Sequence, residues 1–492
     1  MAVKRVQHLE PNGPRTPCAA NLIHQREIRL SGNAAERRKL WAPLVAVACI
    51  VALNFFIRYF LEDADKRIVS FLGHYYGDKL DLIFRQSPWW TLLLPIKALT
   101  GVWSTTGHIF VYMAEQVIGP PRVFFILNAL TILVAFGAGW IAVRSLTFSC
   151  TLALCLGLGT WNHHTYSVPG GMIMYLMMMY MLVNLLSIYF LLRGTASARS
   201  WNLVFLLSLV AMAMCYEQWL DYWVVMVVWG GTLVAWARGA DYQCNLGSLK
   251  FVAVSGMIVA ITYLAIRIPY HTSIGMENDT IHTYSSVIPA IEDFISNVLM
   301  HTYMAVTTLL PLTGMSTSLP ALGPESLIEQ QHGYHSAKSA LVPMHYLFWW
   351  RYVAGGVFAC YVFFLIRMLK AAYRRRALQW SMILLFVLMI GIGHATHDAI
   401  KFRPMNSAPV LTYHLLTAVL GVSLLVSVGL TALRLRLRSK LTSAALVSAA
   451  WAMILLGALV RPGIMSYYAN FVGIGTYPDP VAKLKALIER RH

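Results

Sequence analysis

The chain has 492 residues, of which 58% are hydrophobic and only 12% are charged, and its mean hydropathy is +0.59. A soluble globular protein typically carries about 25% charged residues, so this composition excludes an ordinary water-soluble domain. The net charge of +18 suits either nucleic-acid binding or the cytoplasmic loops of a membrane protein. Apolar stretches of about 20 residues recur along the chain, and each is long enough to cross a bilayer. The sequence therefore predicts an all-α polytopic membrane protein.

The N-terminal segment, residues 1–40, is polar and basic. No short apolar core with a small-residue cleavage site follows it, so we expect no cleaved signal peptide and a retained first transmembrane helix at 41–60. The seven cysteines show neither disulfide nor zinc spacing, and no chemistry is assigned to them.

Ten more apolar runs give about eleven predicted transmembrane helices: 122–143, 147–160, 172–192, 202–216, 220–237, 250–267, 344–366, 379–393, 408–430 and 442–460. Two further apolar segments, 88–116 and 296–312, would raise the number to 13 if both crossed. We expect them to form interfacial helices instead. The transmembrane domain then covers 41–460, with large outer loops at 61–121 and 268–343 and an outer tail at 461–492.

The orientation follows from the distribution of Lys and Arg, because short cytoplasmic loops retain positive charge during insertion. With residues 1–40 inside, the cytoplasmic segments hold 22 of the 39 cations but only four of the 21 acids. The cytoplasmic side carries the whole excess of +18 and the outer side is neutral. The expected location is the bacterial inner membrane, with a cytoplasmic N-terminus and a periplasmic C-terminus. Nucleic acid is not needed to explain the charge.

Three carboxylates follow the first span directly: Glu62, Asp63 and Asp65. Acids so close in sequence repel one another unless a cation or metal lies nearby. At a membrane boundary a carboxylate is also partly desolvated, which makes it a better base. This cluster is therefore a candidate catalytic base or metal site, and a solvated helix cap is the alternative.

Two outer turns carry further candidate side chains. Glu217 and Asp221 lie in the short apolar turn between the fifth and sixth spans, where ionisable residues pair or contact a substrate or metal. His163, His164 and Tyr166 lie in the turn between the third and fourth spans. Adjacent histidines point apart and make poor joint metal ligands, so hydrogen bonding to a polar acceptor is the functional interpretation. Ordinary polar boundary turns are the alternative for both.

Cations are scarce on the outer side close to the membrane. The turn after the ninth span holds His394, His397, Lys401 and Arg403, and Arg351 falls in the outer half of the eighth span. The planar fork of arginine can bind two phosphate oxygens at once, so these residues are candidates for holding a lipid phosphate. Snorkelling of the long side chains toward lipid headgroups is the alternative.

The order of these features resembles the GT-C superfamily of membrane glycosyltransferases. The resemblance rests on the acids at 62–65 in a long outer loop, the span that starts at Pro121-Arg122, the tight turn at Arg144, the outer turn at 161–171 and the span that ends in Leu191-Leu192-Arg193-Gly194. The loop with Asp63, Arg67, Gly73, Gly77 and Asp78 is loosely similar to O-antigen-modifying glucosyltransferases, and Arg403-Pro404 is a weaker similarity. The match covers residues 41–267 as architecture.

The resemblance implies transfer of a sugar from a polyprenyl-phosphate donor to a lipid-linked glycan, a polysaccharide or a protein at the outer face of the membrane. It implies that an outer carboxylate, Asp63 as first choice, deprotonates the acceptor hydroxyl. Lys401 and Arg403, with Arg351 behind them, would stabilise the leaving phosphate, since preorganised charge at a developing anion lowers the barrier. Asp65 or Glu217 would hold a divalent cation, Mg²⁺ or Mn²⁺, if one is required.

Three other functions are the alternatives. A transporter or flippase for a lipid-linked sugar needs charged or broken-helix residues near the bilayer midplane, whereas the acids here cluster at the outer boundary. An O-antigen polymerase or ligase would show much the same sequence pattern, but it would rely more on outer arginines than on a carboxylate. A non-enzymatic assembly subunit has no positive feature in the sequence.

Overall fold

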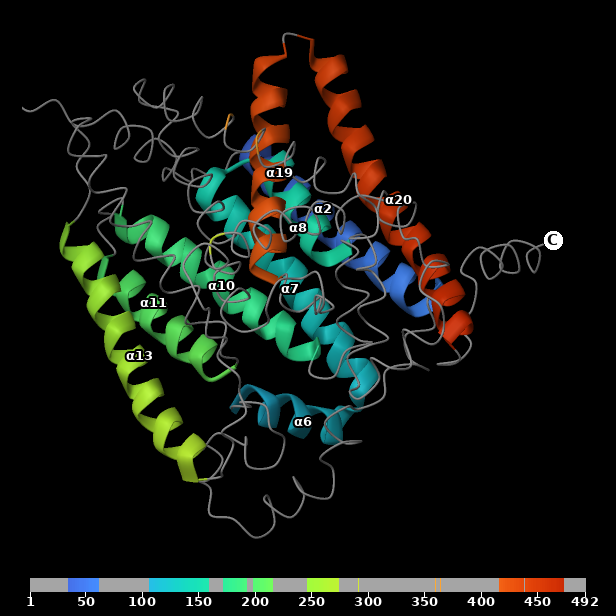
Figure 1. Ribbon diagram of the computed structural model, residues 1–492. Helices are drawn as coiled ribbons and strands as arrows, with labels where there is room; N and C mark the ends of the chain where they lie inside the picture. Colours follow the sequence, from blue (N-terminus) through green and yellow to red (C-terminus); the bar gives the residue numbers. More distant parts are fainter. Residues whose placement is uncertain are drawn as a thin grey trace, which may run out of the picture. The chain divides into compact units, whose positions relative to one another are not determined.

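The computed structural model describes residues 34–61, 106–158, 171–192, 198–215, 246–273, 416–437 and 439–472, with single residues at 291, 359 and 363. Its regular secondary structure within these ranges is helical and contains no strand, which confirms the all-α prediction for them (Figure 1). By its internal contacts the chain divides into two units, 1–46 and 47–492. The first unit contributes only the beginning of helix α2 to the described residues, and the packing described below belongs to the second unit.

Eight of the eleven predicted spans fall on described helices. These are α2 (Ala34–Phe55) with the π-helix η1 (Phe56–Leu61), α7 (Pro120–Val143), α8 (Leu146–Leu158), α10 (Gly171–Leu192), α11 (Ala198–Ala213), α13 (Leu246–Ser273), α19 (Leu416–Arg436) and α20 (Lys440–Val472). Helix α6 (Thr106–Ile118) covers the end of the segment predicted to lie in the interface. The segments 220–237, 296–312 and 379–393 lie outside the described residues, as does 344–366 apart from Ala359 and Phe363.

Two of these helices are long and apolar enough to cross a membrane, Trp41–Tyr59 and Pro121–Val143. Only 33% of the first window and 39% of the second is buried. Six shorter apolar helices accompany them in the described part of the chain. The total of eleven transmembrane helices stays a prediction.

Helix α20 does not end where its apolar run ends. It continues to Val472, through Arg461 and Pro462, whereas the predicted outer tail starts at 461. The apolar run ends at the charge of Arg461 and at Pro462, but the helix continues beyond these two residues, through Tyr467, Tyr468 and other residues of mixed polarity. The beginning of the segment 461–492 is therefore helical.

Helix α8 lies at the centre of the second unit, in contact with α7, α19 and α20. All of its residues from Thr147 to Leu158 are buried. Helix α10 packs on α7 and on α11, and α13 packs on α10 and α11. Thr151 of α8 donates its hydroxyl to the carbonyl of Thr147 at 2.7 Å, and α7 and α19 bond hydroxyls in the same way. Such bonds allow hydroxyl side chains inside an apolar bundle.

Two polar contacts join α8 to the C-terminal hairpin of α19 and α20. Arg434 of α19 donates a hydrogen bond from Nη1 to Oγ1 of Thr147, and Trp451 of α20 donates from Nε1 to Oγ1 of Thr151 at 2.9 Å. Because Thr147 is close to the start of α8 and Arg434 to the end of α19, the turn at Arg144 and the turn between α19 and α20 lie at the same end of the bundle. We call this end the basic end.

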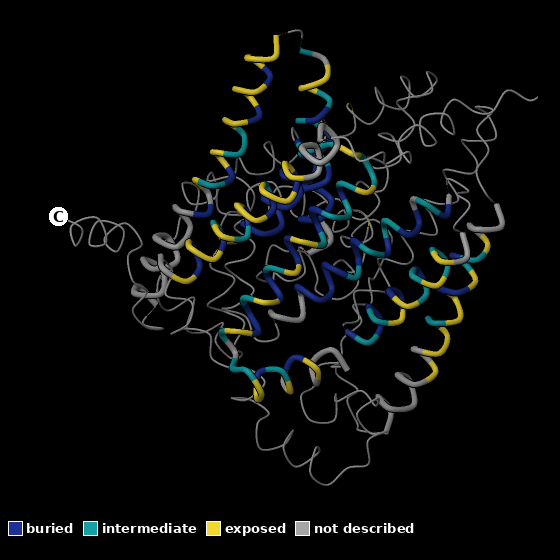
Figure 2. The backbone as a smooth tube through the Cα atoms, turned by 180° about the vertical axis from the view of Figure 1, so that it is seen from behind, coloured by how far each residue is buried: buried dark blue, intermediate teal, exposed yellow. Residues whose placement is uncertain are grey.

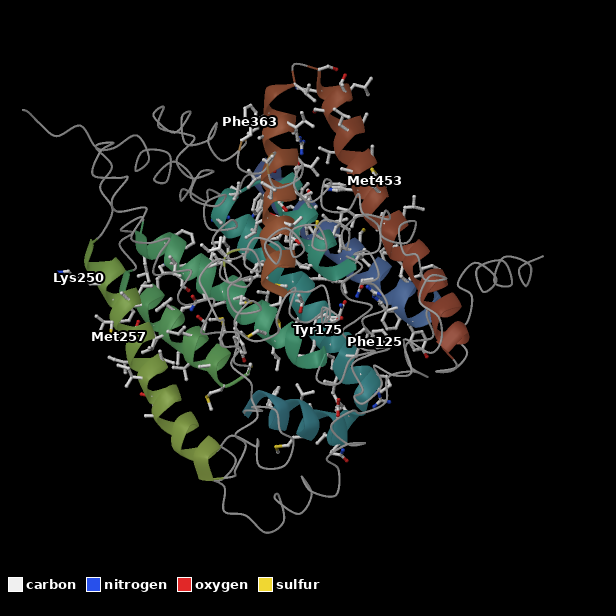
Figure 3. All side chains as sticks on the ribbon, viewed as in Figure 1. Phe125, Tyr175, Lys250, Met257, Phe363 and Met453 are labelled. Carbon is white, nitrogen blue, oxygen red and sulfur yellow. The ribbon has the colours of Figure 1, made fainter. Side chains whose placement is uncertain are left out.

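The exposed faces of the helices are apolar and several buried positions are polar. Leu203, Leu207 and Val210 form an exposed row on α11. The exposed row on α13 is formed by Val254, Met257, Ile258 and Ile261, and Figure 3 shows Met257 pointing away from the neighbouring helices. Buried polar side chains, by contrast, include Asn54, Asn128, Thr131, Asn184, Ser208, Ser423 and Ser427. Figure 2 shows how the exposed positions run along the helices of the bundle.

Candidate functional site

Three buried polar side chains from three helices form a hydrogen-bonded chain. Asn54 of α2 donates from Nδ2 to Oδ1 of Asn128 on α7, and Asn128 donates from its own Nδ2 to the hydroxyl of Tyr175 on α10 at 3.0 Å. Asn54 is 2% exposed, and Asn128 and Tyr175 are fully buried. The Oδ1 atom of Asn54 is buried and has no hydrogen-bond partner among the described residues, so one acceptor of the cluster is left unused. We call these three residues the polar chain.

Arg58 lies four residues after Asn54 and is completely buried. It belongs to the π-helix η1, which continues α2 up to Leu61. One-turn π segments are frequent at functional sites because they re-aim the side chains that follow. A buried guanidinium is costly in an apolar bundle and usually serves a partner or a function.

Aromatic rings surround this end of α2. Phe55 and Tyr59 stack at 5.2 Å, and both rings contact Phe125 of α7, at 5.3 and 5.8 Å. Phe124 contacts the ring of Tyr175 at 5.8 Å. Figure 3 labels Phe125 and Tyr175, which come from neighbouring helices. These rings provide an apolar boundary beside the polar chain and Arg58.

The polar chain lies far from the basic end. Asn128 is 16 residues before Arg144 on a continuous helix, which places the two Cα atoms about 24 Å apart along the α7 axis. Asn128 is eight residues from the start of α7, or about 12 Å. Tyr175 is likewise close to the start of α10, so α7 and α10 begin at the same end of the bundle. The polar chain and Arg58 are therefore close to the end opposite the basic turns.

A buried carboxylate approaches the same end. Glu115 is 5% exposed and lies in the last turn of α6, which packs against α7 and α10. Its carbonyl accepts a hydrogen bond from the amide of Gly119 at 2.9 Å, just before α7 begins. Gly119 has φ of 86°, a backbone conformation that favours glycine and turns the chain sharply from α6 into α7.

Every site residue predicted from the sequence lies outside the described residues. These are Glu62, Asp63, Asp65, His163, His164, Tyr166, Glu217, Asp221, Arg351, His394, His397, Lys401 and Arg403. The acids at 62–65 follow Leu61 in the chain, and Leu61 is the last residue of the π-helix that holds Arg58. The predicted roles of these residues stay predictions.

Asn54, Arg58, Asn128, Tyr175 and Glu115 are not among the residues predicted from the sequence. The sequence does mark two of them, because Asn54 and Arg58 are polar residues four apart in an otherwise apolar run. Asn128, the partner of Asn54, is 74 residues away, and Tyr175, the next partner of Asn128, is 47 residues further along, so no local pattern marks the pairing.

Within the described ranges, no group of three or more His, Cys, Asp or Glu side chains could hold a metal ion. The Mg²⁺ or Mn²⁺ site considered for Asp65 and Glu217 concerns residues beyond those ranges and stays a prediction.

A search of protein-family models and of curated proteins finds no match to this chain.

Proposed function

We propose that the protein is a polytopic glycosyltransferase of the bacterial inner membrane with a GT-C-like arrangement of helices. It takes a sugar from a polyprenyl-phosphate donor and transfers it to a lipid-linked glycan, a polysaccharide or a protein at the outer face. The observation that carries the proposal is Arg58, a fully buried cation in a π-helix that leads directly into the acids at 62–65.

Insertion in a membrane is supported by the distribution of polarity. The helices expose leucine, isoleucine, valine and methionine and bury asparagine, serine and threonine. In water this arrangement would expose an extensive apolar surface, whereas in lipid it exposes the side chains that lipid accepts. The basic turns at Arg144 and between α19 and α20 share one end of the bundle, which agrees with a cytoplasmic assignment for both.

The chemistry needs one base and one cationic site. In our scheme Asp63 removes the proton from the acceptor hydroxyl, whose oxygen then forms a bond to the anomeric carbon of the sugar. The bond between that carbon and the phosphate oxygen breaks, and its electron pair leaves with the polyprenyl phosphate. Arg58, Lys401 and Arg403 offset the charge that develops on this phosphate.

The test of this assignment measures transfer of labelled sugar from a polyprenyl-phosphate hexose into envelope polymers, in membranes that contain the full-length protein. Asp63→Asn should reduce transfer by about 10²- to 10⁴-fold, as expected when a positioned base is lost. Asp241→Asn, an acid of a predicted cytoplasmic segment, is the matched control and should retain activity. Asp65→Asn and Glu62→Gln identify which acid acts. Wild-type transfer in all three outer variants, with normal membrane insertion, would refute the carboxylate mechanism.

Arg58 is tested by two substitutions of different chemistry. Arg58→Lys keeps the charge but loses the planar fork that binds two phosphate oxygens. We expect reduced transfer in Arg58→Lys and a larger loss in Arg58→Gln, with both variants inserted. If Arg58→Gln transfers sugar normally, Arg58 does not serve the donor phosphate.

The polar chain favours one second candidate, a transporter or flippase for the same lipid-linked sugar. Asn128 lies about 12 Å from the start of α7, on the way from that end of the helix toward the bilayer midplane where transport proteins place substrate contacts. A transporter makes no new covalent product. Purified protein that forms a glycosylated acceptor in detergent would exclude transport alone, while movement of donor across vesicles without a product would favour the transporter.

A further inference from the structure

The basic end of the bundle is built from two turns that are remote in sequence. Arg144 ends α7 in the left-handed conformation, with φ of 54° and its amide donating to the carbonyl of Trp140 at 2.9 Å. Among non-glycine residues this conformation is uncommon and costs about 1 kcal/mol or more. Asparagine or glycine would serve a simple helix end better, so an arginine at this position suggests a use for the side chain, which is exposed.

The second turn brings Arg434 to the same place. Its Nη1 atom donates to Thr147, which is only three residues after Arg144. This bond uses one of the five donors of the guanidinium and fixes the direction of the side chain, which stays exposed to solvent. Lys440, at the start of α20, is a third exposed cation beside this turn.

Apolar side chains accompany these cations. Leu435 is 75% exposed and Leu441 is 82% exposed, and Leu433 is also exposed. Leu433 and Leu435 flank Arg434 in sequence, and Leu441 follows Lys440. Neighbouring residues of a helix project about 100° apart, so these leucines lie to the side of the cations. The turn therefore offers an apolar surface next to a charged group, which suits a ligand with a charged head and an apolar body.

The sequence of both turns is basic without acidic residues. The segment 431–447 contains four cations and no Asp or Glu, and the segment 140–151 contains Arg144 and no acid. An anion at this end would therefore meet complementary charge from two turns.

We propose that the basic end binds the headgroup of an anionic phospholipid of the cytoplasmic leaflet. Arg434, held by Thr147, forms charge-assisted hydrogen bonds to the lipid phosphate, and Arg144 and Lys440 complete the positive site. The acyl chains lie against the exposed leucines of α19 and α20. The inference rests on the membrane insertion in the proposed function and is independent of sugar transfer.

The experiment measures lipid retention by the full-length protein in detergent, using native mass spectrometry with phosphatidylglycerol and with phosphatidylcholine. The wild type should retain phosphatidylglycerol preferentially. Arg144→Gln and Arg434→Gln should each weaken its binding about fivefold, and the double variant more, as expected for cations near an anionic headgroup. Lys250→Gln removes an exposed cation at the start of α13 and is the matched control, with binding unchanged.

Two further measurements distinguish a specific lipid-binding site from nonspecific electrostatic attraction between cations and anionic lipids. Thr147→Val keeps both arginines but frees Arg434, and we expect weaker lipid binding than in the wild type, together with the small loss of stability that removal of one interhelical hydrogen bond causes. Inorganic phosphate at millimolar concentration should not displace the lipid. Equal retention of the two lipids, an equal loss in Lys250→Gln, or displacement by phosphate alone would overturn the proposal. Because lipid retention does not depend on turnover, a protein that lacks transferase activity can still pass this test.

Discussion

The close packing of α7 on α8 depends on Gly157, and adding one methyl group there should be destabilising. A Cβ atom at Gly157 would lie 2.3 Å from Cγ1 and 2.7 Å from Cδ1 of Ile132. Ile132 is fully buried, so its side chain has little room to move. Overpacking of this kind typically costs about 1–3 kcal/mol.

Gly137→Ala is the matched control on α7, because a Cβ atom there meets nothing within 4 Å. Alanine favours the helix over glycine by about 1 kcal/mol at either position, so this gain cancels when the two variants are compared. The difference in free energy of unfolding between Gly157→Ala and Gly137→Ala should therefore be about 1–3 kcal/mol, with Gly157→Ala the less stable.

Unfolding in mixed micelles with an increasing fraction of dodecyl sulfate, followed by circular dichroism, measures this difference. A double-mutant cycle with Ile132→Ala tests the cause, since that substitution removes both colliding atoms. In the Ile132→Ala background, Gly157→Ala should be neutral or stabilising, which corresponds to a coupling of about 0.5–3 kcal/mol. Equal stability of the two glycine variants, or independence of the Ile132 and Gly157 substitutions, would refute the packing argument.

Four further substitutions test interhelical hydrogen bonds, which average about 0.6 kcal/mol in membrane proteins. Tyr175→Phe should cost about that amount, whereas Asn128→Leu breaks two bonds and should cost more. Asn184→Leu removes hydrogen bonds to the carbonyl of Phe205 at 3.2 Å and to the hydroxyl of Ser208 at 3.0 Å, and should weaken the packing of α10 on α11. The same unfolding assay measures the loss of stability in these three variants, and wild-type stability in any of them would contradict its prediction. Trp451→Phe should increase hydrogen exchange in α8, measured by mass spectrometry, and an unchanged exchange rate would show that its bond contributes nothing.

The positions of the helices were largely predictable because the apolar runs are bounded by residues that commonly begin or end helices, such as glycine, proline and charged residues. The run at 122–143 matches α7 within two residues, since Gly119 and two prolines precede it and Arg144 follows it. Where the boundary signal was only a charge and a proline, at Arg461 and Pro462, the helix continued and the prediction ended too early. Hydropathy reports the length of an apolar run, whereas helix length depends on backbone hydrogen bonds that polar residues also allow.

The pairing of distant side chains was not predictable from the sequence. Asn128 contacts Asn54 across 74 residues and Tyr175 across 47, and in each case the partner is one of many polar residues at a similar depth. Arg58 lies only four residues before Glu62, yet the acids at the membrane boundary give the stronger local signal. Local composition marks a boundary, but only the packing of helices shows which polar residues inside the apolar runs meet.

The burial of α8 also constrains the order in which the helices can pack during synthesis. Its polar partners Arg434 and Trp451 follow Thr147 and Thr151 by 287 and 300 residues. At typical rates of synthesis, about 5–20 residues per second, a ribosome needs about 15–60 s to produce the missing hairpin. During that interval α8 has neither α19 nor α20 to cover it, so the emerging chain must shield a central helix by other means. A chain that terminates before residue 416 would lack both helices, so the burial of α8 by α19 and α20 requires the C-terminal hairpin.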